Sequence, residues 1–274
     1  MVMLLNELEN PEELPRYEAT AKWVSQQKVD GDHFIATFKN GKVRLTNRHG
    51  NDYTAQFPEI VLGLGIAKDK EVVLNGEIAY WDKDKKVFDF NTFRGRQGIQ
   101  SPTEIKRRVA RNPCRLHVFD LIEYDGIKMA NNSDYPFEKR HNLLKRIVQD
   151  NAVTELLPIR TDLTQHFKEE CEADREGIVL KHKDNIYFEG RSDSVLKCKN
   201  WNTSTIQFTK AEENPAGVTL ENEWGDRVLV AGKKAELVRA ILIQTGGVNC
   251  KIRHLQGRTE NNRLREPTFK EVLI

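Results

Sequence analysis

Gln26-Gln27-Lys28-Val29-Asp30-Gly31 is the stretch around which the rest of this chain is organised. Residues two apart on a β-strand share a face, so a strand here would point Lys28 and Asp30 into one pocket, with Val29 packed behind them. A lysine is a nucleophile only when its amine is unprotonated, which requires a partly desolvated, cation-rich pocket. The alternative is a solvated Lys-Asp pair beside a turn glycine, because short motifs recur by chance.

Six further segments follow this lysine: Asn47-Arg48-His49-Gly50, Phe57-Pro58-Glu59-Ile60, Asn75-Gly76-Glu77-Ile78, Phe119-Asp120-Leu121, Glu176-Gly177-Ile178-Val179-Leu180-Lys181 and Lys197-Cys198-Lys199. With these segments in this order, residues 22–201 resemble the ATP-dependent DNA ligases, members of the covalent nucleotidyltransferase superfamily. The resemblance implies an α+β fold. Residues 1–202 would form an ATP-grasp-like nucleotidyltransferase domain of antiparallel sheets with flanking helices, and residues 203–274 a small OB-type β-barrel domain.

Composition is that of an ordinary soluble protein. The 274 residues are 38% hydrophobic and 31% charged, with a net charge of only +2. No apolar run approaches the roughly 20 residues of a membrane span, and the first residues lack a basic signal-like region. We therefore expect a cytoplasmic protein without membrane contact, associated with the nucleoid if the cell is prokaryotic. Any nucleic-acid surface must be local, and residues 249–265, with five basic residues and one acid, are a candidate unless they form a solvated charged tail.

The cysteines indicate neither a zinc site nor a disulfide framework. They lie far apart and form no C-x-x-C pair, at Cys114, Cys171, Cys198 and Cys250. Bystander thiols in a reducing compartment are the expectation.

Local patterns predict the main elements. Alternating runs around Asn40-Gly41 predict a β-hairpin over residues 34–47. Residues 6–24 are predicted to be a helical or irregular lead-in. Further predictions are strands over 71–81 and 115–124, and helices that begin at Pro102 or span 135–149 and 162–174. Beyond residue 202, short strands over 205–210, 217–221 and 226–231 with a helix over 233–244 suit a small OB-type barrel.

The resemblance assigns the nucleotide chemistry to four residues. Lys28 would attack the α-phosphate of ATP, expel pyrophosphate and carry AMP as a lysyl-adenylate, while Asp30 fixes the lysine and the ribose. Lys197 and Lys199 would contact the phosphates and lower the pKa of Lys28. For the two later lysines, a solvated strand face is the alternative.

Glu77 and Glu176 match the family's metal and ribose carboxylates, and two carboxylates can hold Mg²⁺, or Mn²⁺ in its place, through oxygen ligands and water. Phe119 matches the residue that stacks on adenine, and the Gln26 amide would read the adenine amino edge. Without the family context, the alternative interpretation is that Glu77 and Glu176 are turn residues and that Phe119 is a core residue. His33 stands where the family usually has an arginine at the nucleotide, and is mostly neutral at pH 7.

Arginines are expected to contact the nucleic acid. Arg48, which would also lie near the nucleotide, and Arg96 resemble phosphate-contacting arginines of the family and would bind the 5′-phosphate or the DNA backbone. Arg263 and Arg265 of the basic segment are further candidates for DNA contacts.

The two ends of the chain depart from the larger ligases. Only 27 residues precede Lys28, so a separate DNA-encircling domain is not expected. The family's small domain normally ends in a basic motif beyond an Arg-x-Pro-x-Phe-like segment, which Arg265-Glu266-Pro267-Thr268-Phe269 resembles. The basic motif itself does not follow. We expect Arg258, Arg263, Arg265 or Lys270 to orient the pyrophosphate leaving group in its place.

The predicted function is that of a compact two-domain ATP-dependent DNA ligase, which seals nicks between a 5′-phosphate and a 3′-hydroxyl in duplex DNA as a monomer. An RNA ligase or a GTP-dependent mRNA-capping guanylyltransferase would use the same lysyl-nucleotidyl chemistry. A catalytically silent nucleic-acid-binding protein is an alternative of another class. The sequence does not distinguish replication, repair and end joining, and it leaves open whether a replication or end-joining partner binds.

Overall fold

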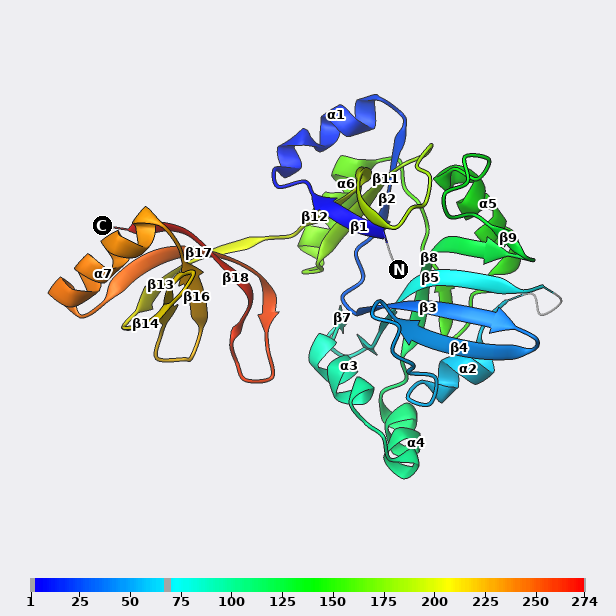
Figure 1. Ribbon diagram of the computed structural model, residues 1–274, viewed down its shortest axis with the longest axis horizontal. Helices are drawn as coiled ribbons and strands as arrows, with labels where there is room; N and C mark the ends of the chain where they lie inside the picture. Colours follow the sequence, from blue (N-terminus) through cyan, green and yellow to red (C-terminus); the bar gives the residue numbers. More distant parts are fainter. Residues whose placement is uncertain (1–2, 67–69, 274) are drawn as a thin grey trace. The chain divides into compact units, whose positions relative to one another are not determined.

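The computed structural model describes residues 3–66 and 70–273. They divide into two compact units, with the boundary between Lys199 and Asn200. This boundary lies three residues before the one predicted from the sequence. Figure 1 shows the elements of unit 1 and of unit 2.

The larger sheet of unit 1 has six strands in the order β10-β8-β5-β3-β4, with β9 paired to β8. Only the ladder between β10 and β8 is parallel. The strands are β3 (Asp32–Lys39), β4 (Lys42–Asn47), β5 (Val72–Ala79), β8 (Arg115–Tyr124), β9 (Ile127–Lys128) and β10 (Thr154–Leu156). The predicted hairpin is confirmed, because Asn40 and Gly41 join β3 to β4 with φ values of 50° and 70°.

The smaller sheet of unit 1 has four strands in the order β1-β12-β11-β2. They are β1 (Met3–Glu7), β2 (Trp23–Gln27), β11 (Gly177–His182) and β12 (Gly190–Lys199). Strand β1 runs parallel to β12 and was not predicted, since the lead-in was expected to be helical or irregular. A separate short pair consists of β6 (Trp81–Asp82) and β7 (Val87–Phe88).

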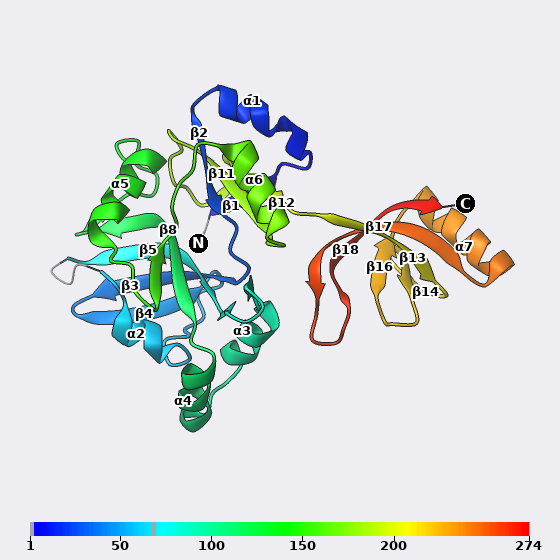
Figure 2. The same ribbon diagram turned by 180° about the vertical axis from the view of Figure 1, so that it is seen from behind.

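Helices cover both sheets (Figures 1 and 2). Helices α1 and α6 lie over the smaller sheet, and α5 packs on β8. Their bounds are η1 (Pro11–Glu13), α1 (Leu14–Ala19), α2 (Pro58–Gly63), α3 (Phe90–Gln97), α4 (Pro102–Arg111), α5 (Phe137–Ile147) and α6 (Leu163–Glu172). Helix α4 begins as predicted, with the Ser101 side chain accepting from the Glu104 amide and Pro102 in the first turn. None of the helices in the described ranges is long and apolar enough to cross a membrane.

Three apolar clusters hold unit 1 together. The largest lies between the six-stranded sheet and its helices, and the second lies between the smaller sheet and helices α1 and α6. The third is small and consists of Val29, Ala79 and Leu157, with Phe88 and Phe119 against it. Because Val29 follows β2 and Ala79 ends β5, this third cluster packs the end of one sheet onto the other.

Unit 2 consists of two three-stranded sheets, β13-β17-β18 and β14-β15-β16, around one core. Strand β13 continues into β14 through Thr209, so the two sheets follow one strand path, as in an OB-type arrangement. The elements are β13 (Asn202–Phe208), β14 (Lys210–Asn214), β15 (Gly217–Glu221), β16 (Arg227–Val230), α7 (Lys233–Thr245), β17 (Val248–Arg258) and β18 (Leu264–Leu273).

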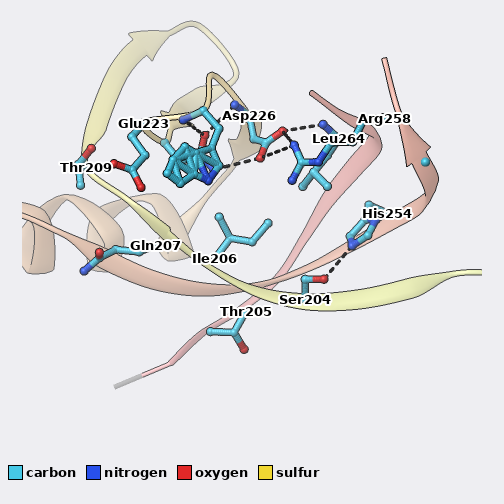
Figure 3. A pocket seen from close by; sticks show the side chains of 13 residues that line it. Ser204, Thr205, Ile206, Gln207, Thr209, Glu223, Asp226, His254, Arg258 and Leu264 are labelled. Carbon is cyan, nitrogen blue, oxygen red and sulfur yellow. Dashed lines mark hydrogen bonds and ion pairs between the residues drawn. The ribbon is translucent and has the colours of Figure 1, made fainter. Parts of the chain in front are cut away.

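A buried carboxylate joins two loops of unit 2. Asp226, which is 1% exposed, accepts from the Leu264 amide at 2.6 Å and from Asn222 Nδ2 at 3.0 Å, and pairs with Arg258 Nη1 at 3.0 Å. Figure 3 shows these contacts at the edge of an open cavity of about 630 Å³, which Ser204 and His254 also line. Arg258 is therefore bound into the fold, and this pairing argues against the role at a leaving group that we expected for it.

Arg96 is buried as well, and the expectation that it contacts DNA is wrong. It is 1% exposed and pairs with Glu59 Oε1 at 2.9 Å. Its guanidinium also donates to the carbonyl oxygens of Asn112 and Gln56, each at 2.8 Å. These contacts join α3 to α2 and to the segment before β8, so this arginine has a structural role.

Replacing Arg96 by Ala should therefore destabilise unit 1. Removing one partner of a buried ion pair leaves the other uncompensated, which typically costs about 3–5 kcal/mol. Urea unfolding of Arg96→Ala should show a loss of that order, while Arg94→Ala, an exposed arginine of the same helix, should change stability by less than about 0.5 kcal/mol. Similar small losses in both variants would contradict the structural role.

Candidate active site

Lys28 lies where the two sheets of unit 1 meet. Strand β2 ends at Gln27, so the prediction that Lys28 and Asp30 share a strand face is wrong. Instead, the Lys28 amide donates to the Gly177 carbonyl at 2.9 Å, and Lys28 Nζ lies 2.8 Å from Glu176 Oε1. The lysine and the glutamate thus flank the ends of two paired strands, β2 and β11.

Two glycines permit this geometry. A Cβ on Gly31 would lie 2.3 Å from the Ile78 carbonyl oxygen, so only glycine lets the chain after Lys28 pass this close to β5. Gly177 has a φ of +118°, in the region that side chains rarely adopt. The first glycine brings the lysine segment to the strand that bears Glu77, and the second directs Glu176 back toward Lys28.

Carboxylates dominate the electrostatics of Lys28. Burial lowers its pKa, but the charges of Glu176, Glu77 and Asp30 outweigh burial, and the pKa is raised above its ordinary value. The expectation that Lys197 and Lys199 lower it is wrong for the protein without nucleotide. In that state Lys28 is an ammonium group.

The two later lysines lie on the expected face, each with a carboxylate partner. Lys199 is opposite Gly177 in the β11–β12 ladder, and its Nζ is 3.7 Å from Glu176 Oε1. Lys197 lies opposite Val179, two residue pairs further along the ladder, and its Nζ is 3.5 Å from Glu7 Oε2. Of these two lysines, Lys199 contacts the same Glu176 oxygen as Lys28.

Glu77 supplies the second carboxylate that acts on Lys28. Burial raises the pKa of Glu77 to about 8, and the nearby charges of Glu176, Asp32 and Asp30 add to this rise, while Lys28 opposes it. Within the described ranges, no group of three or more His, Cys, Asp or Glu side chains is arranged to hold a metal alone. Glu77 and Glu176 as a pair fit an ion such as Mg²⁺, which commonly uses one or two carboxylates together with substrate phosphates.

Gln26 and Phe119 lie around Leu157. Gln26 is 1% exposed and its Nε2 donates to the Leu157 carbonyl at 3.0 Å, while its Oε1 is buried with no partner among the described residues. Phe119 packs against the cluster that contains Leu157, at a bulge in the β5–β8 ladder. Bulges commonly redirect a side chain next to a functional site. The structure thus brings a ring and an unsatisfied acceptor to the same region.

His33 lies directly opposite Glu77 in the β3–β5 ladder. Its Nε2 forms a hydrogen bond with Asn75 Oδ1, and its ring centroid is 6.0 Å from that of Phe119. The pKa of His33 is lowered to about 4, chiefly by burial and also by the charge of Arg48, while the hydrogen bond to Asn75 opposes this shift. His33 is therefore neutral at pH 7, as predicted.

The remaining predicted residues differ in exposure. Arg48 is exposed in the turn after β4, where its Nε donates to His49 Nε2 at 3.1 Å. Arg263 is exposed in the hairpin loop between β17 and β18, and Arg265 Nη1 donates to the Gln256 carbonyl at 3.4 Å. These last two residues belong to unit 2, whereas Arg96 is part of the core of unit 1.

Sequence reasoning missed a buried charge cluster behind Phe119. Asp120 accepts from Arg140 at 2.7 Å and 3.0 Å, and Lys181 Nζ lies 3.9 Å from Asp120 Oδ2. Lys181 also donates to the Phe119 carbonyl at 2.8 Å, and burial lowers its pKa to about 8. The sequence signal that could have found this cluster is proximity to predicted site residues. Asp120 directly follows Phe119, and Lys181 ends the segment that begins with Glu176.

Comparison with known families identifies this arrangement. Residues 2–199 match the sequence model of the ATP dependent DNA ligase domain. The chain belongs to the ATP-dependent DNA ligase domain family. The resemblance inferred from the seven sequence segments is thereby confirmed.

Curated relatives of this ligase-domain protein are longer than the chain. The multifunctional non-homologous end joining protein LigD of Mycobacterium bovis is 28% identical over 189 residues, which are 68% of this chain and 22% of LigD. A DNA ligase of Methanothrix thermoacetophila is 26% identical over 219 residues, which are 77% of this chain and 35% of that ligase. The chain matches less than two thirds of the length of either relative.

A solved structure, described as a structure-function analysis of Lig E DNA ligases that bind DNA with a minimal scaffold, has the same fold. Its TM-score is 0.64 at 18% identity, over 99% of this chain and 98% of the other. This likeness confirms the predicted fold class, an α+β nucleotidyltransferase fold followed by an OB-type domain.

The raised pKa of Glu77 predicts a pH dependence of stability. The folded protein keeps the Glu77 proton to about pH 8, whereas the unfolded chain loses it near 4.5, so this group makes stability fall as pH rises between these values. Without divalent cations, the melting temperature of the wild type should therefore fall more between about pH 5 and pH 8 than that of Glu77→Gln. Equal falls in the two proteins would contradict the assignment.

Proposed function

We propose that the protein is an ATP-dependent DNA ligase that acts through a lysyl-adenylate at Lys28. The observation that carries this proposal is the contact between Lys28 Nζ and Glu176 Oε1 at 2.8 Å, with Lys199 3.7 Å from the same oxygen. A nucleophilic amine, a carboxylate and a second cation lie together at one edge of a mostly buried site. Phosphoryl transfer needs little more than such positioning and charge stabilisation.

In the first step, the unprotonated Lys28 amine attacks the α-phosphorus of ATP. A nitrogen–phosphorus bond forms, the bond to the bridging oxygen breaks, and pyrophosphate leaves with the electron pair of that bond. Glu77 and Glu176 would hold Mg²⁺, or Mn²⁺, which supplies positive charge that offsets the phosphates and these two carboxylates. Lys28 releases its ammonium proton to solvent before the attack, and positive charge beside the two carboxylates would favour this release by lowering the pKa of Lys28. Glu176 and Lys199 orient the lysine and the phosphates.

In the later steps, Lys28 passes AMP to the 5′-phosphate of a nick, and the 3′-hydroxyl then displaces AMP to form the phosphodiester bond. Asp30 and His33 lie beside the ribose in this proposal, and Arg48 contacts the 5′-phosphate. Arg263 and Arg265 contact DNA from unit 2. The adenylation domain in this proposal is unit 1, which ends at Lys199, and the OB-type domain is unit 2, which begins at Asn200.

The base pocket favours ATP over GTP. The Gln26 amide is oriented by its hydrogen bond to Leu157, which leaves Oε1 as an unsatisfied acceptor. The amino group of adenine is a donor that satisfies this oxygen, whereas the corresponding position of guanine carries an acceptor. Phe119 would stack on the base. This argues for a ligase rather than a GTP-dependent capping enzyme.

The proposed substrate is nicked duplex DNA, with the chain acting as a monomer. The relatives are named DNA ligase or end joining protein, which supports DNA rather than RNA as the polymer. ATP and DNA both occur inside the cell, so we place the protein there. RNA ligase remains the second candidate function, because it would use the same Lys28 chemistry.

Labelling with ATP tests the function directly. Wild type incubated with α-labelled ATP and Mg²⁺ should retain label after denaturing electrophoresis, and α-labelled GTP should give none. Lys28→Ala should lose the label entirely yet stay folded, because Lys199 still lies 3.7 Å from Glu176 Oε1 and no apolar core side chain is removed. It should still seal a nick that already carries AMP, at a reduced rate. Label retained by Lys28→Ala would refute the lysyl-adenylate.

Arg48 should contribute one phosphate contact to nick binding. Each contact adds about 0.9 to the slope of log affinity against log salt on duplex DNA. Arg48→Ala should reduce this slope by about that amount for a 5′-phosphorylated nick, with no change in sequence preference. Arg44→Ala, an exposed arginine of β4 that pairs with Asp52, is the matched control and should leave the slope unchanged. An unchanged slope in Arg48→Ala would remove this contact from the proposal.

A further inference from the structure

The carboxylate of Glu170, on helix α6, contacts two residues that adjoin the active site. Its Oε2 accepts from Gln27 Nε2 at 3.0 Å, and its Oε1 accepts from Arg175 Nη1 at 3.0 Å. Gln27 immediately precedes Lys28, and Arg175 immediately precedes Glu176. One carboxylate on a helix therefore joins the two short segments that carry the central ion pair.

A second contact holds β2 against the same helix. Ser25 Oγ forms a hydrogen bond with His166 Nδ1 at 2.7 Å, four residues before Glu170 along α6. The Arg175 amide donates to the Glu170 carbonyl at 2.9 Å, so the chain that leaves α6 returns to it before Glu176. Figure 2 shows α6 lying along β11 in the smaller sheet.

The Glu170 carboxylate is buried, which is energetically unfavourable for a charged group. The residue is 4% exposed, and burial raises its pKa although Arg175 and Gln27 oppose the rise. A buried carboxylate costs free energy that a well-packed apolar residue would avoid, so stability alone gives a weak account of it. Its two oxygens instead define a fixed separation between two donors on different segments.

We propose that Glu170 is a positioning residue for nucleotidyl transfer, which sets the place of Lys28 relative to Glu176 by holding Gln27 and Arg175. The inference rests on the proposed function. A displacement of about 1 Å at a nucleophile can cost about a hundredfold in rate. Loss of this link should therefore slow the attack by Lys28 more than it weakens the binding of ATP.

Glu170→Gln tests the link with little change in volume. The glutamine carbonyl can still accept from Gln27, but its amino group then faces the Arg175 guanidinium, and both groups are donors. In single-turnover labelling at saturating ATP, we expect a rate constant at least about tenfold lower, with the KM for ATP within about twofold of wild type. The final labelled fraction should equal that of wild type. Glu172→Gln, on the exposed face of the same helix, is the matched control and should behave as wild type.

A compensating change separates positioning from simple folding. In the double variant Glu170→Gln/Arg175→Gln, the two introduced amides can hydrogen-bond to each other. The rate constant should therefore be at least about threefold higher than that of Glu170→Gln alone. Arg175→Gln alone should be slow, since it leaves the buried carboxylate without its cation. Gln27→Met removes the other donor and should give a similarly slow, complete reaction. If Glu170→Gln does not fold, the rate constant of Gln27→Met tests the positioning role instead.

The outcomes are distinct. An unchanged rate constant in Glu170→Gln and Gln27→Met, or a reduced labelled fraction with a normal rate constant, would overturn the positioning role and leave a structural one. Absence of recovery in the double variant would also count against it. Absence of label in the wild type would refute the proposed function itself, which is a different result from any of these.

Discussion

The active site depends on the pair formed by Lys28 and Glu176 at the paired ends of two strands of the smaller sheet, next to a strand of the larger sheet. The β2–β11 ladder brings the two residues together, and the Lys28 amide extends that ladder to Gly177. The close passage at Gly31 then places the pair beside β5 and Glu77. The backbone distance at Gly31 and the backbone conformation at Gly177 require glycine, which explains why the sequence motifs of this site include glycine.

Local chemistry could be read from the sequence, and pairing between distant segments could not. The Asn40-Gly41 turn and the cap of α4 depend on neighbours in the chain. The burial of Arg96 depends on Glu59 and on the carbonyl of Asn112, which no local pattern reveals. A basic residue among polar neighbours therefore looked like a DNA contact although it lies in the core.

The predicted direction of the Lys28 pKa shift was wrong for a related reason. Two lysines near a nucleophile suggest a cationic pocket, but each has an acid within 3.7 Å, and Glu77 and Asp30 face the nucleophile as well. The protein without nucleotide therefore holds its lysine charged and one carboxylate protonated. In the protein without nucleotide the Lys28 amine is therefore in its non-nucleophilic ammonium form.

The Asp226 contacts give the last hairpin of unit 2 a role in the cooperativity of that unit. Strands β17 and β18 carry Arg258 and Leu264, whose donors satisfy a carboxylate that is 1% exposed in the turn between β15 and β16. Removal of the hairpin would take away the cation and the backbone amide that contact Asp226, together with the central strand β17 of one sheet, and should therefore destabilise the whole unit. The contribution of Arg263, which is exposed in the loop of this hairpin, should therefore be tested by point substitution rather than by deletion of the hairpin.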